Sequence, residues 1–162
     1  MSSPGEGLTH VAPDGSARMV DVGGKAETAR MARVGGAITM ARTTLVAIQR
    51  NELAKGDVLA VARVAGVMGA KRTADLIPLC HPLPLTDLQV ELTLDESLPG
   101  VRVEVTARSV GRTGVEMEAF VGASVALLTV YDMAKAIDRG MTIGDISLLE
   151  KTGGAKGDYA RS

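Results

Sequence analysis

Asp132 and Lys135 are the pair of side chains in this sequence best placed to move a proton. They follow Val121, Val125 and Leu128 at spacings of three and four, so in a helix they continue an apolar stripe toward its C-terminal end. Spacing alone favours an exposed salt bridge between residues i and i+3. The functional alternative is a pocket at the edge of the core, where burial disfavours both charges and mutual attraction favours them. A proton donor and acceptor tuned in this way contribute about 10²–10⁴-fold in rate.

A second predicted helix shows the same change from apolar to charged residues. Val61, Val64 and Met68 form a seam at helical spacing, and Lys71 and then Asp75 continue it. Lys71 can extend its amine to solvent, which is the default for a long amphipathic side chain, or it can face an anionic ligand. Because both helices become charged at the C-terminal end of an apolar seam, we expect one shared polar pocket.

The segment 78–84 contains three prolines in seven residues. Prolines fix the backbone and disfavour both helix and sheet, so this segment is predicted as a rigid loop that holds His81 in one orientation. Its position leaves open whether His81 is a hydrogen-bonded structural imidazole or a functional group. For Cys80, a small buried hydrophobic role is favoured over that of a nucleophile.

Glu116 and Glu118 flank Met117 at the start of a long predicted helix. Thr113 and Glu116 fit a capping box, with Thr113 as the N-cap. On a regular helix the two carboxylates point about 200° apart and cannot share a pocket, so a functional Glu118 leaves Glu116 as a cap or an interface residue unless the helix start is extended. The glycine-rich tail after Lys151 can bind phosphate through backbone N–H groups, although such tails are more often only flexible.

The sequence predicts no metal site and no cofactor. Two histidines and one cysteine without paired ligand spacing exclude a zinc site of the usual kind. Walker A, dinucleotide-binding and nucleophile-elbow patterns are absent. Oxygen-ligated cation sites need no fixed spacing, so the sequence leaves open whether a divalent cation accompanies a phosphate-bearing ligand.

The predicted elements place these side chains on an α+β fold. The clearest feature is a hairpin, because residues 88–94 and 101–107 alternate between apolar and polar around a turn-rich connection. The order strand, helix, strand, strand, helix, strand predicts a ferredoxin-like fold, with an antiparallel four-stranded sheet and two long helices on one face. The other expected elements are a short strand over 19–22, a loop over 25–33, strands over 37–41 and 143–149, and helices over 45–49, 58–76 and 115–139.

Two smaller features accompany these elements. Asp57 is the expected N-cap of the helix over 58–76, and Thr43 or Thr44 the cap of the short helix before it. Gly66 and Gly69 each cost about 1 kcal/mol relative to alanine inside a helix, so another element is expected to pack closely against their face.

Length and composition predict one soluble globular domain over residues 1–162, with a flexible leader at 1–8 and a glycine-rich, mobile tail at 152–162. The net charge of −1 disfavours a general nucleic-acid or membrane binder. No apolar run approaches the roughly 20 residues that span a bilayer, and no signal peptide is visible. One cysteine cannot form an internal disulfide, which favours the cytoplasm. Two tyrosines, one phenylalanine and no tryptophan imply an aliphatic core.

Six segments of the chain, in order, carry a resemblance to a known family. They are residues 19–22 (MVDV), 70–73 (AKRT), 76–82 (LIPLCHP), 113–119 (TGVEMEA), 128–133 (LTVYDM) and 148–154 (LLEKTGG). Together they closely resemble the cyclic pyranopterin monophosphate synthases, molybdenum cofactor biosynthesis protein C (the MoaC family), from about residue 8 to residue 158. A small departure at Ala134, where the family often has cysteine, affects no proposed catalytic group.

The resemblance implies a lyase that converts 3′,8-cyclo-7,8-dihydroguanosine triphosphate into cyclic pyranopterin monophosphate and pyrophosphate. It also implies a ferredoxin-like fold and a hexamer built from three dimers, with sites between subunits. By matching motifs, Asp132, Lys135 and Lys55 are the implied catalytic residues. The implied substrate-binding residues are Leu79, Cys80, His81, Met117 and Glu118, with Lys71, Glu116 and Lys151 in the same pocket.

The charges of the chain are consistent with this implied function. A triphosphate carries about four negative charges, and a chain of net charge −1 must gather cations locally to bind one. The fold or a neighbouring subunit must therefore bring Lys55, Lys71, Lys135 and Lys151 together. Asp132 and Lys135 are expected to shuttle the protons of the purine-to-pterin rearrangement.

Two other classes of function share the expected fold. A regulatory domain that only senses a nucleotide would also need the lysines, but it offers no reason for an Asp–Lys pair at the end of a core seam. An RNA-binding ferredoxin-like domain is opposed by the balanced charge and by the scarcity of aromatic residues for stacking.

Overall fold

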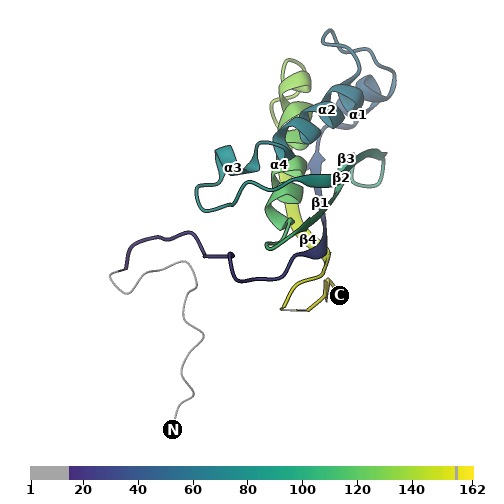
Figure 1. The fold of residues 1–162 in the computed structure, drawn as a ribbon. Helices are drawn as coiled ribbons and strands as arrows, with labels where there is room; N and C mark the ends of the chain where they lie inside the picture. The colour runs from purple at the N-terminus through teal and green to yellow at the C-terminus, as the bar shows by residue number, and fades with distance from the viewer. Residues whose placement is uncertain (1–14, 156) are drawn as a thin grey trace.

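The sheet contains five antiparallel strands in the order β2-β3-β1-β4-β5 (Figure 1). In chain order they are β1 (Thr28–Thr39), β2 (Leu85–Asp95), β3 (Gly100–Gly111), β4 (Thr142–Thr152) and β5 (Tyr159–Ala160). The computed structural model describes residues 15–155 and 157–162. The leader expected at 1–8 lies outside these residues. The α+β class and the antiparallel sheet are confirmed, whereas the expected number of four strands is one too few, because β5 pairs with β4.

The hairpin of β2 and β3 confirms the alternating pattern. Val90 and Leu92 on β2 are buried, as are Val103 and Val105 on β3, while the residues between them are more exposed. The pairing of the two strands runs without a break from Asp87, opposite Arg108, to Asp95, opposite Gly100. Both strands are longer than the alternation alone predicted. A one-residue slip would turn the whole apolar row to solvent, which is why the pattern specifies the register so strongly.

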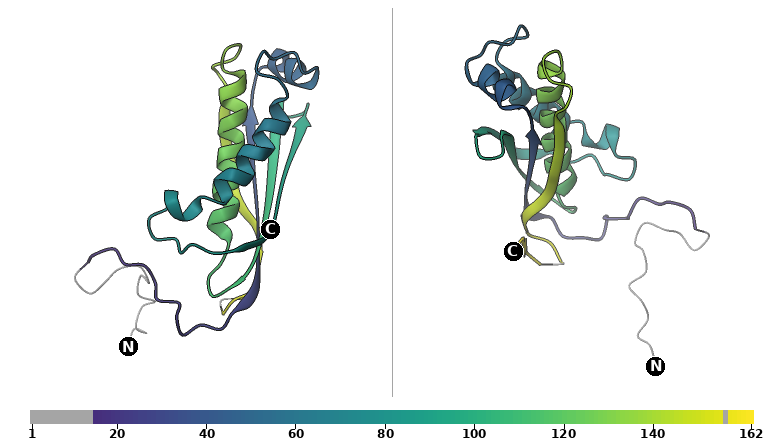
Figure 2. Two further views of the ribbon diagram at one scale, coloured as in Figure 1. Left: turned by 45° about the horizontal axis from the view of Figure 1, so that its top comes forward. Right: turned by 180° about the vertical axis from the view of Figure 1, so that it is seen from behind.

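Four helices connect the strands: α1 (Arg42–Gln49), α2 (Val58–Ala70), α3 (Thr73–Leu76) and α4 (Glu116–Ala134). The helices α2 and α4 pack against each other on one face of the sheet (Figure 2). The close approach of these two helices confirms that another element packs against the face that carries Gly66 and Gly69. A Cβ atom on Gly69 would lie 2.7 Å from Val125 Cγ2, and one on Gly66 would lie 3.0 Å from the carbonyl oxygen of Gly122.

The core is aliphatic, as the composition predicted. Its largest fully buried apolar side chains are Ile38, Leu127, Val34, Val101, Val105, Val115 and Val130. By length and composition α4 is apolar enough to cross a membrane, but 56% of its most apolar window is buried inside the fold. Because α4 packs on β1, β3 and β4, it serves as the core helix of the domain.

The first strand corrects two expectations. Residues 19–22 form no strand, and the loop expected over 25–33 is largely β1, which runs from Thr28 to Thr39. The first half of β1 is polar and has no alternating apolar residues, so its composition is typical of an exposed loop. The strand β1 lies between β3 and β4 and pairs with both, so hydrogen bonding on its two sides overrides weak local preference.

The helix boundaries also differ from those expected. The helix expected over 58–76 divides into α2 and α3, because the Thr73 hydroxyl donates to the carbonyl oxygen of Ala70 (2.8 Å) and the backbone turns there. The helix expected over 115–139 ends at Ala134. Beyond it, the Asp138 carboxylate accepts hydrogen bonds from Ala41 N (2.9 Å) and from the Thr44 hydroxyl (3.1 Å). Neither Thr43 nor Thr44 caps α1, whereas Asp57 caps α2 as predicted.

The apolar seam predicted on the first long helix faces outward. Val61, Val64 and Met68 are 44%, 59% and 51% exposed, and Leu128 on α4 is 57% exposed. The buried face of α2 instead consists mainly of small residues, among them Ala62, Gly66, Gly69 and Ala70. Side-chain size at the contact sets the separation of two helices, so a close α2–α4 pair buries small residues and leaves the large ones outside.

Candidate functional site

Lys55, Asp132 and Lys135 form one contiguous group, which we call the acid–base cluster. Asp132 and Lys135 lie at the C-terminal end of α4, and Lys55 lies in the turn before α2. The Nζ atoms of Lys55 and Lys135 lie 2.7 Å from Oδ2 and Oδ1 of Asp132, respectively. Lys55 Nζ also donates to the carbonyl oxygen of Asp132 at 3.0 Å. The sequence prediction of an Asp132–Lys135 pair is therefore met, and a third group separated by 77 residues joins it.

The exposure of the acid–base cluster matches the salt bridge that spacing alone favoured. The three side chains are 50–54% exposed, so the partly buried pocket of the functional alternative is not formed within one chain. Hydrogen bonds from Lys135 and Lys55, together with the charges of both ammonium groups, lower the pKa of the Asp132 carboxyl to about 2. Attraction therefore outweighs burial, and Asp132 is an ionised proton acceptor held between two ammonium donors over the whole physiological range.

The shared pocket predicted for the two helices is not formed within one chain. The helices run antiparallel, since Gly66 and Ala70 near the end of α2 lie against Gly122 in the first half of α4. Lys71, at the end of α2, therefore lies near the start of α4. Asp132 lies fourteen residues further along α4 than Glu118, which is about 21 Å of helix at 1.5 Å per residue. The two charged helix ends thus lie at opposite ends of the molecule.

Lys71 and Glu118 line the same cavity of about 300 Å³, which we call the Glu118 cavity. Its wall also includes Thr73, Asp75 and Leu85. Glu118 is only 5% exposed, and burial raises the pKa of its carboxyl, as does the nearby charge of Glu116. The backbone N–H of Glu118 donates to its own carboxylate, whereas no other side chain of the described residues forms a hydrogen bond or an ion pair with it. A buried carboxylate without such a partner is costly unless a ligand completes it.

The proline-containing loop lies next to this cavity. Residues 78–84 form neither helix nor strand, as predicted, and Ser109 donates to the carbonyl oxygen of Pro84 at 2.7 Å. Burial raises the pKa of the Cys80 thiol, and the charge of Glu118 raises it further. A raised pKa keeps the thiol protonated, which opposes a role as nucleophile.

The two neighbours of Cys80 are half-buried. Leu79 and His81 both have intermediate exposure. The His81 imidazole has no hydrogen-bond or ion-pair partner among the described residues. The predicted alternative of a hydrogen-bonded structural imidazole is therefore not what the chain alone forms.

Glu116 and Lys151 form an ion pair on the other side of the α4 start. Lys151 Nζ lies 3.0 Å from Glu116 Oε1, and both side chains are about 30% exposed. The capping box expected here is wrong: the N-cap is Val115, without a side-chain cap, because Glu116 is drawn to Lys151 on β4. Met117, between the two glutamates, is 37% exposed.

The pair of Glu116 and Lys151 lines a larger cavity of about 640 Å³, which we call the cationic cavity. Lys25, Arg30 and Arg112 line it too, and sequence reasoning missed all three. A signal for Arg30 was present. It stands two and four residues before the buried Ala32 and Val34, so strand alternation extends their buried row to a cation.

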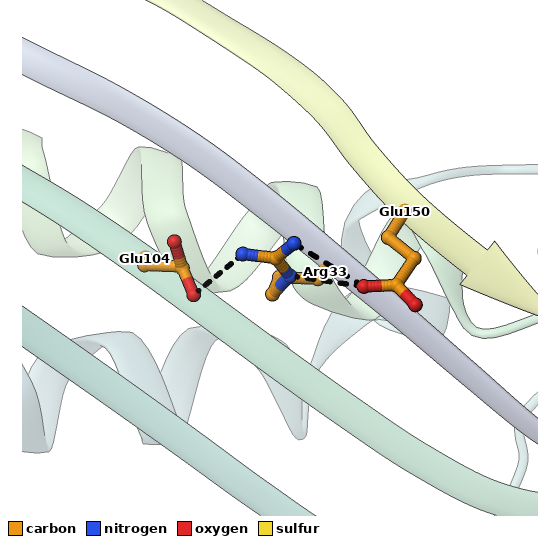
Figure 3. A network of polar contacts seen from close by, with 3 residues as sticks. All are labelled: Arg33, Glu104 and Glu150. Carbon is orange, nitrogen blue, oxygen red and sulfur yellow. Dashed lines mark hydrogen bonds and ion pairs between the residues drawn. The ribbon is translucent and has the colours of Figure 1, made fainter. Parts of the chain in front are cut away.

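The opposite, helix-free face of the sheet carries none of the predicted site residues. There Arg33 on β1 bridges Glu104 on β3 and Glu150 on β4, at 3.1 Å and 3.2 Å (Figure 3). A shallow cavity of about 770 Å³ on this face is lined by Gly35, Gly36 and strand residues beside them. In the described part of the chain, no three His, Cys, Asp or Glu side chains are grouped to hold a metal ion.

Comparison with known proteins gives a consistent result. A model of the MoaC family matches residues 19–154. Cyclic pyranopterin monophosphate synthase of Brucella ovis and that of Brucella melitensis biotype 2 are each 59% identical over 155 residues, covering 96% of this chain and 94% of the relative. The same synthase of Brucella suis biovar 1 is 58% identical over the same coverage.

Proposed function

The chain belongs to the MoaC family, and from this premise we propose that it converts 3′,8-cyclo-7,8-dihydroguanosine triphosphate into cyclic pyranopterin monophosphate and pyrophosphate. It is a lyase of molybdenum cofactor biosynthesis, as the resemblance in its motifs implied. The observation that carries the chemical proposal is the acid–base cluster, in which one carboxylate is held by two ammonium groups 2.7 Å away.

The reaction needs both proton transfer and phosphoryl transfer. An internal hydroxyl oxygen forms a bond to the α-phosphorus, the bond from that phosphorus to the pyrophosphate oxygen breaks, and the hydroxyl proton passes to a base. Asp132 and Lys135 are proposed as the groups that accept and return protons, and Lys55 as the cation that positions Asp132. Ammonium groups at the site also stabilise negative charge that develops on the phosphate oxygens.

The groups proposed to bind substrate gather around the start of α4. Leu79, Cys80 and His81 form the loop beside the Glu118 cavity, and Lys71 provides a cation at its wall. The buried carboxylate of Glu118 is supported as a binding group because no side chain in the described part of the chain pairs with it. Met117, Glu116 and Lys151 extend the proposed binding surface from that cavity to the cationic cavity.

We propose that a second copy of the chain completes the site. Within one chain about 21 Å of helix separates Glu118 from Asp132. Between the two ends lies the exposed apolar stripe of Val61, Val64 and Met68, which a soluble protein normally covers. A two-fold contact along this stripe packs the helices antiparallel. It thereby brings the Glu118 end of one chain to the acid–base cluster of the other, as expected for a hexamer of three dimers.

The finer class of the fold belongs to the same proposal. The strand order β2-β3-β1-β4 with two long helices on one face supports a ferredoxin-like core, to which β5 is added at the edge. We treat residues 1–162 as one catalytic domain in the cytoplasm. No cofactor is proposed, and a divalent cation bound to the triphosphate is left to experiment.

The direct test is incubation of the purified full-length chain with the cyclic dihydroguanosine triphosphate, followed by a pyrophosphate assay and phosphorus NMR of the product. We expect one equivalent of pyrophosphate for each cyclic phosphate diester formed. Binding of the substrate without release of pyrophosphate would replace the proposal with that of a nucleotide sensor.

Mixing two inactive variants tests the shared site. Asp132→Asn and Glu118→Gln each damage a different half of it. After dissociation and reassembly of an equal mixture, random pairing leaves one intact site in each mixed dimer, so about a quarter of the wild-type activity should return. Each variant treated alone is the control. No recovery, with mixed oligomers verified by mass spectrometry, would show that each chain holds a complete site.

A further inference from the structure

Lys55 is the member of the acid–base cluster whose position depends most on the rest of the fold. Its side chain is half-exposed, and it lies in the segment 50–57 between α1 and α2, which forms neither helix nor strand. Lys55 Nζ nevertheless lies 2.7 Å from Oδ2 of Asp132 and 3.0 Å from its carbonyl oxygen. A long amine loses conformational freedom when it is held in this way. The fold must therefore fix the backbone that carries Lys55.

The segment that carries Lys55 is fixed to the end of α1. The Glu52 N–H donates to the carbonyl oxygen of Ala47 at 2.9 Å. Leu53 packs against the core, and the Gly56 N–H closes a turn around Lys55 by donating to the Leu53 carbonyl oxygen at 3.0 Å. The placement of Lys55 therefore follows the placement of α1.

Asp138 joins the start of α1 to the segment after α4. Its Oδ2 atom accepts hydrogen bonds from Ala41 N at 2.9 Å and from the Thr44 hydroxyl at 3.1 Å. Its Oδ1 atom accepts from Gly140 N at 2.9 Å. Thr44 is only 2% exposed, and α1 has no side-chain cap of its own. The bond from Ala41 is the largest cause that lowers the pKa of the Asp138 carboxyl, so this group is ionised at neutral pH and its hydrogen bonds are charge-assisted.

These contacts close a ring of links around the acid–base cluster. From Asp132 the chain continues through Lys135 to Asp138, whose carboxylate binds the start of α1. From there α1 and the segment 50–57 lead to Lys55, whose amine returns to Asp132. The three groups that donate to Asp138 all lie outside the acid–base cluster. Asp138 is therefore linked to the cluster through the backbone on both sides.

We propose that Asp138 is a positioning residue for the reaction, because it ties α1 to the segment after α4 and so holds Lys55 within hydrogen-bond reach of Asp132. This inference rests on the proposed function and adds to it a residue whose own contacts lie outside the acid–base cluster. A displacement of about 1 Å, caused by a change far from the chemistry, can cost about 10²-fold in rate. Loss of the Asp138 carboxylate leaves α1 free to shift relative to α4, so that Lys55 no longer reaches both of its acceptors.

The first measurement compares the steady-state kinetics of Asp138→Ala with those of Asp95→Ala, the matched control. Asp95 also holds a loop by accepting from backbone N–H groups, those of Ser97 at 2.8 Å and Leu98 at 3.1 Å, but this loop joins β2 to β3. We expect Asp138→Ala to lower kcat by about tenfold or more. Its KM should not change, because the proposed substrate-binding groups lie at the other end of α4. Asp95→Ala should retain wild-type kcat even where its thermal unfolding midpoint falls.

The second measurement follows Lys55 directly and needs no turnover. The amines of the full-length protein are labelled with a limiting amount of acetic anhydride, and mass spectrometry gives the labelling of Lys55 relative to that of the exposed Lys25. We expect Asp138→Ala to raise the relative labelling of Lys55 by about two- to fivefold, as for loss of an exposed ion pair. Asp95→Ala should leave it unchanged. A carboxylate that only stabilised the start of α1 would not alter this ratio.

Two milder variants keep the test valid if Asp138→Ala does not fold. Asp138→Asn retains one acceptor oxygen for Ala41 and Thr44. Thr44→Val removes one of the donors but keeps a buried side chain of similar shape. Both variants should change kcat and the labelling of Lys55 in the same direction as Asp138→Ala, by smaller factors.

Three results would overturn the positioning role. They are unchanged kcat and labelling in all the variants of Asp138 and Thr44, equal loss of kcat in Asp138→Ala and Asp95→Ala, and a fall in kcat with unchanged labelling of Lys55. If the wild type releases no pyrophosphate from the substrate but the labelling of Lys55 rises in Asp138→Ala, the placement of Lys55 by Asp138 stands and the proposed reaction is rejected. If the wild type releases pyrophosphate and neither readout changes, the positioning role alone is rejected.

Discussion

The two ends of α4 present opposite electrostatic arrangements. At the C-terminal end, Asp132 is half-exposed and both of its oxygens are paired with ammonium groups. At the N-terminal end, Glu118 is buried, and within residues 15–155 and 157–162 no side chain pairs with it and the buried Nε of the nearby Arg30 has no hydrogen-bond partner. The C-terminal end is therefore complete in the isolated chain, whereas the N-terminal end is left for something else to complete.

The pKa values of the carboxyls at the two ends of α4 shift in opposite directions. Two ammonium groups lower the pKa of Asp132 to about 2, while burial raises the pKa of Glu118. Environments that push the pKa values of two carboxyls apart assign them different roles in one reaction. We interpret Asp132 as the carboxylate that is ionised, and so able to accept a proton, before substrate binds, and Glu118 as a group whose charge depends on what it binds.

The largest expected effect is that of Asp132→Asn on turnover. The amide keeps the shape but removes the charge that holds Lys55 and Lys135, so kcat should fall by about 10²–10⁴-fold. Exposed ion pairs contribute little to stability, so the thermal unfolding midpoint should change little. Steady-state kinetics and thermal unfolding of the same samples check both statements.

Glu52→Gln is the matched control for that variant. Glu52 is an exposed carboxylate paired with Arg50 at 3.9 Å, and it lies three residues before Lys55. It should retain wild-type kcat. Equal loss of activity in both variants would indicate a general effect of charge rather than a specific role of Asp132.

The second expected effect is a gain of stability in Glu118→Gln. At neutral pH, above the unfolded-state pKa, a carboxyl whose pKa is raised by burial disfavours the folded state, and the neutral amide avoids this cost. The free energy of unfolding, measured in urea at pH 7, should rise by about 0.5–2 kcal/mol, the usual range for one stabilising substitution. Substrate affinity should fall in the same variant. A loss of stability would show that the Glu118 carboxylate is satisfied in the isolated chain.

The gain of stability in Glu118→Gln should depend on pH, with a sign opposite to that expected for Asp132. The folded-state pKa of Glu118 lies above its unfolded value, so wild-type stability from this group is complete below the unfolded pKa and is lost as the pH rises through the folded one. The advantage of Glu118→Gln should therefore vanish below about pH 4. For Asp132, whose folded pKa is about 2, the sign is opposite: its contribution is present above about pH 4 and is lost toward pH 2.

The smallest expected effect concerns the Glu116–Lys151 pair. Its side chains are about 30% exposed, so Lys151→Met should lower the free energy of unfolding by no more than about 1 kcal/mol. A double-mutant cycle with Glu116→Gln measures the coupling between the two groups. A coupling well above that value would indicate that the pair, and not only the ligand, organises the start of α4.

Much of the fold followed from local patterns. The hairpin was predictable because alternation of apolar residues with period two specifies both the element and its buried face. The start of α2 followed from Asp57, whose carboxylate accepts from Ala60 N at 2.9 Å. The strand expected over 37–41 is the end of β1, but the earlier part of β1 was missed because its polar first half is stabilised by pairing with two neighbours distant in sequence.

One contact of the candidate site was predictable from the sequence, but the arrangement of the site was not. The motif around Asp132 indicated the pair with Lys135, yet spacing could not show that Lys55 joins it. The seam of Val61, Val64 and Met68 was predicted to be buried, but the glycines on the adjacent face allowed close helix packing that turned it outward. Arg30 was missed together with the first part of β1, because the position of its side chain depends on the strand that carries it.

The sequence by itself determined which side chains are available for chemistry, the hairpin register and the family to which the motifs belong, because each depends on residue types and short-range periodicity. Only the tertiary structure decided that the charged ends of α2 and α4 lie apart and that Lys55 meets Asp132. It also decided that, among the described residues, Glu118 has no side-chain partner and Arg30 Nε has no hydrogen-bond partner. These outcomes depend on the antiparallel packing of two helices and on strand pairing across more than a hundred residues, and no local pattern in the chain encodes the distances that result.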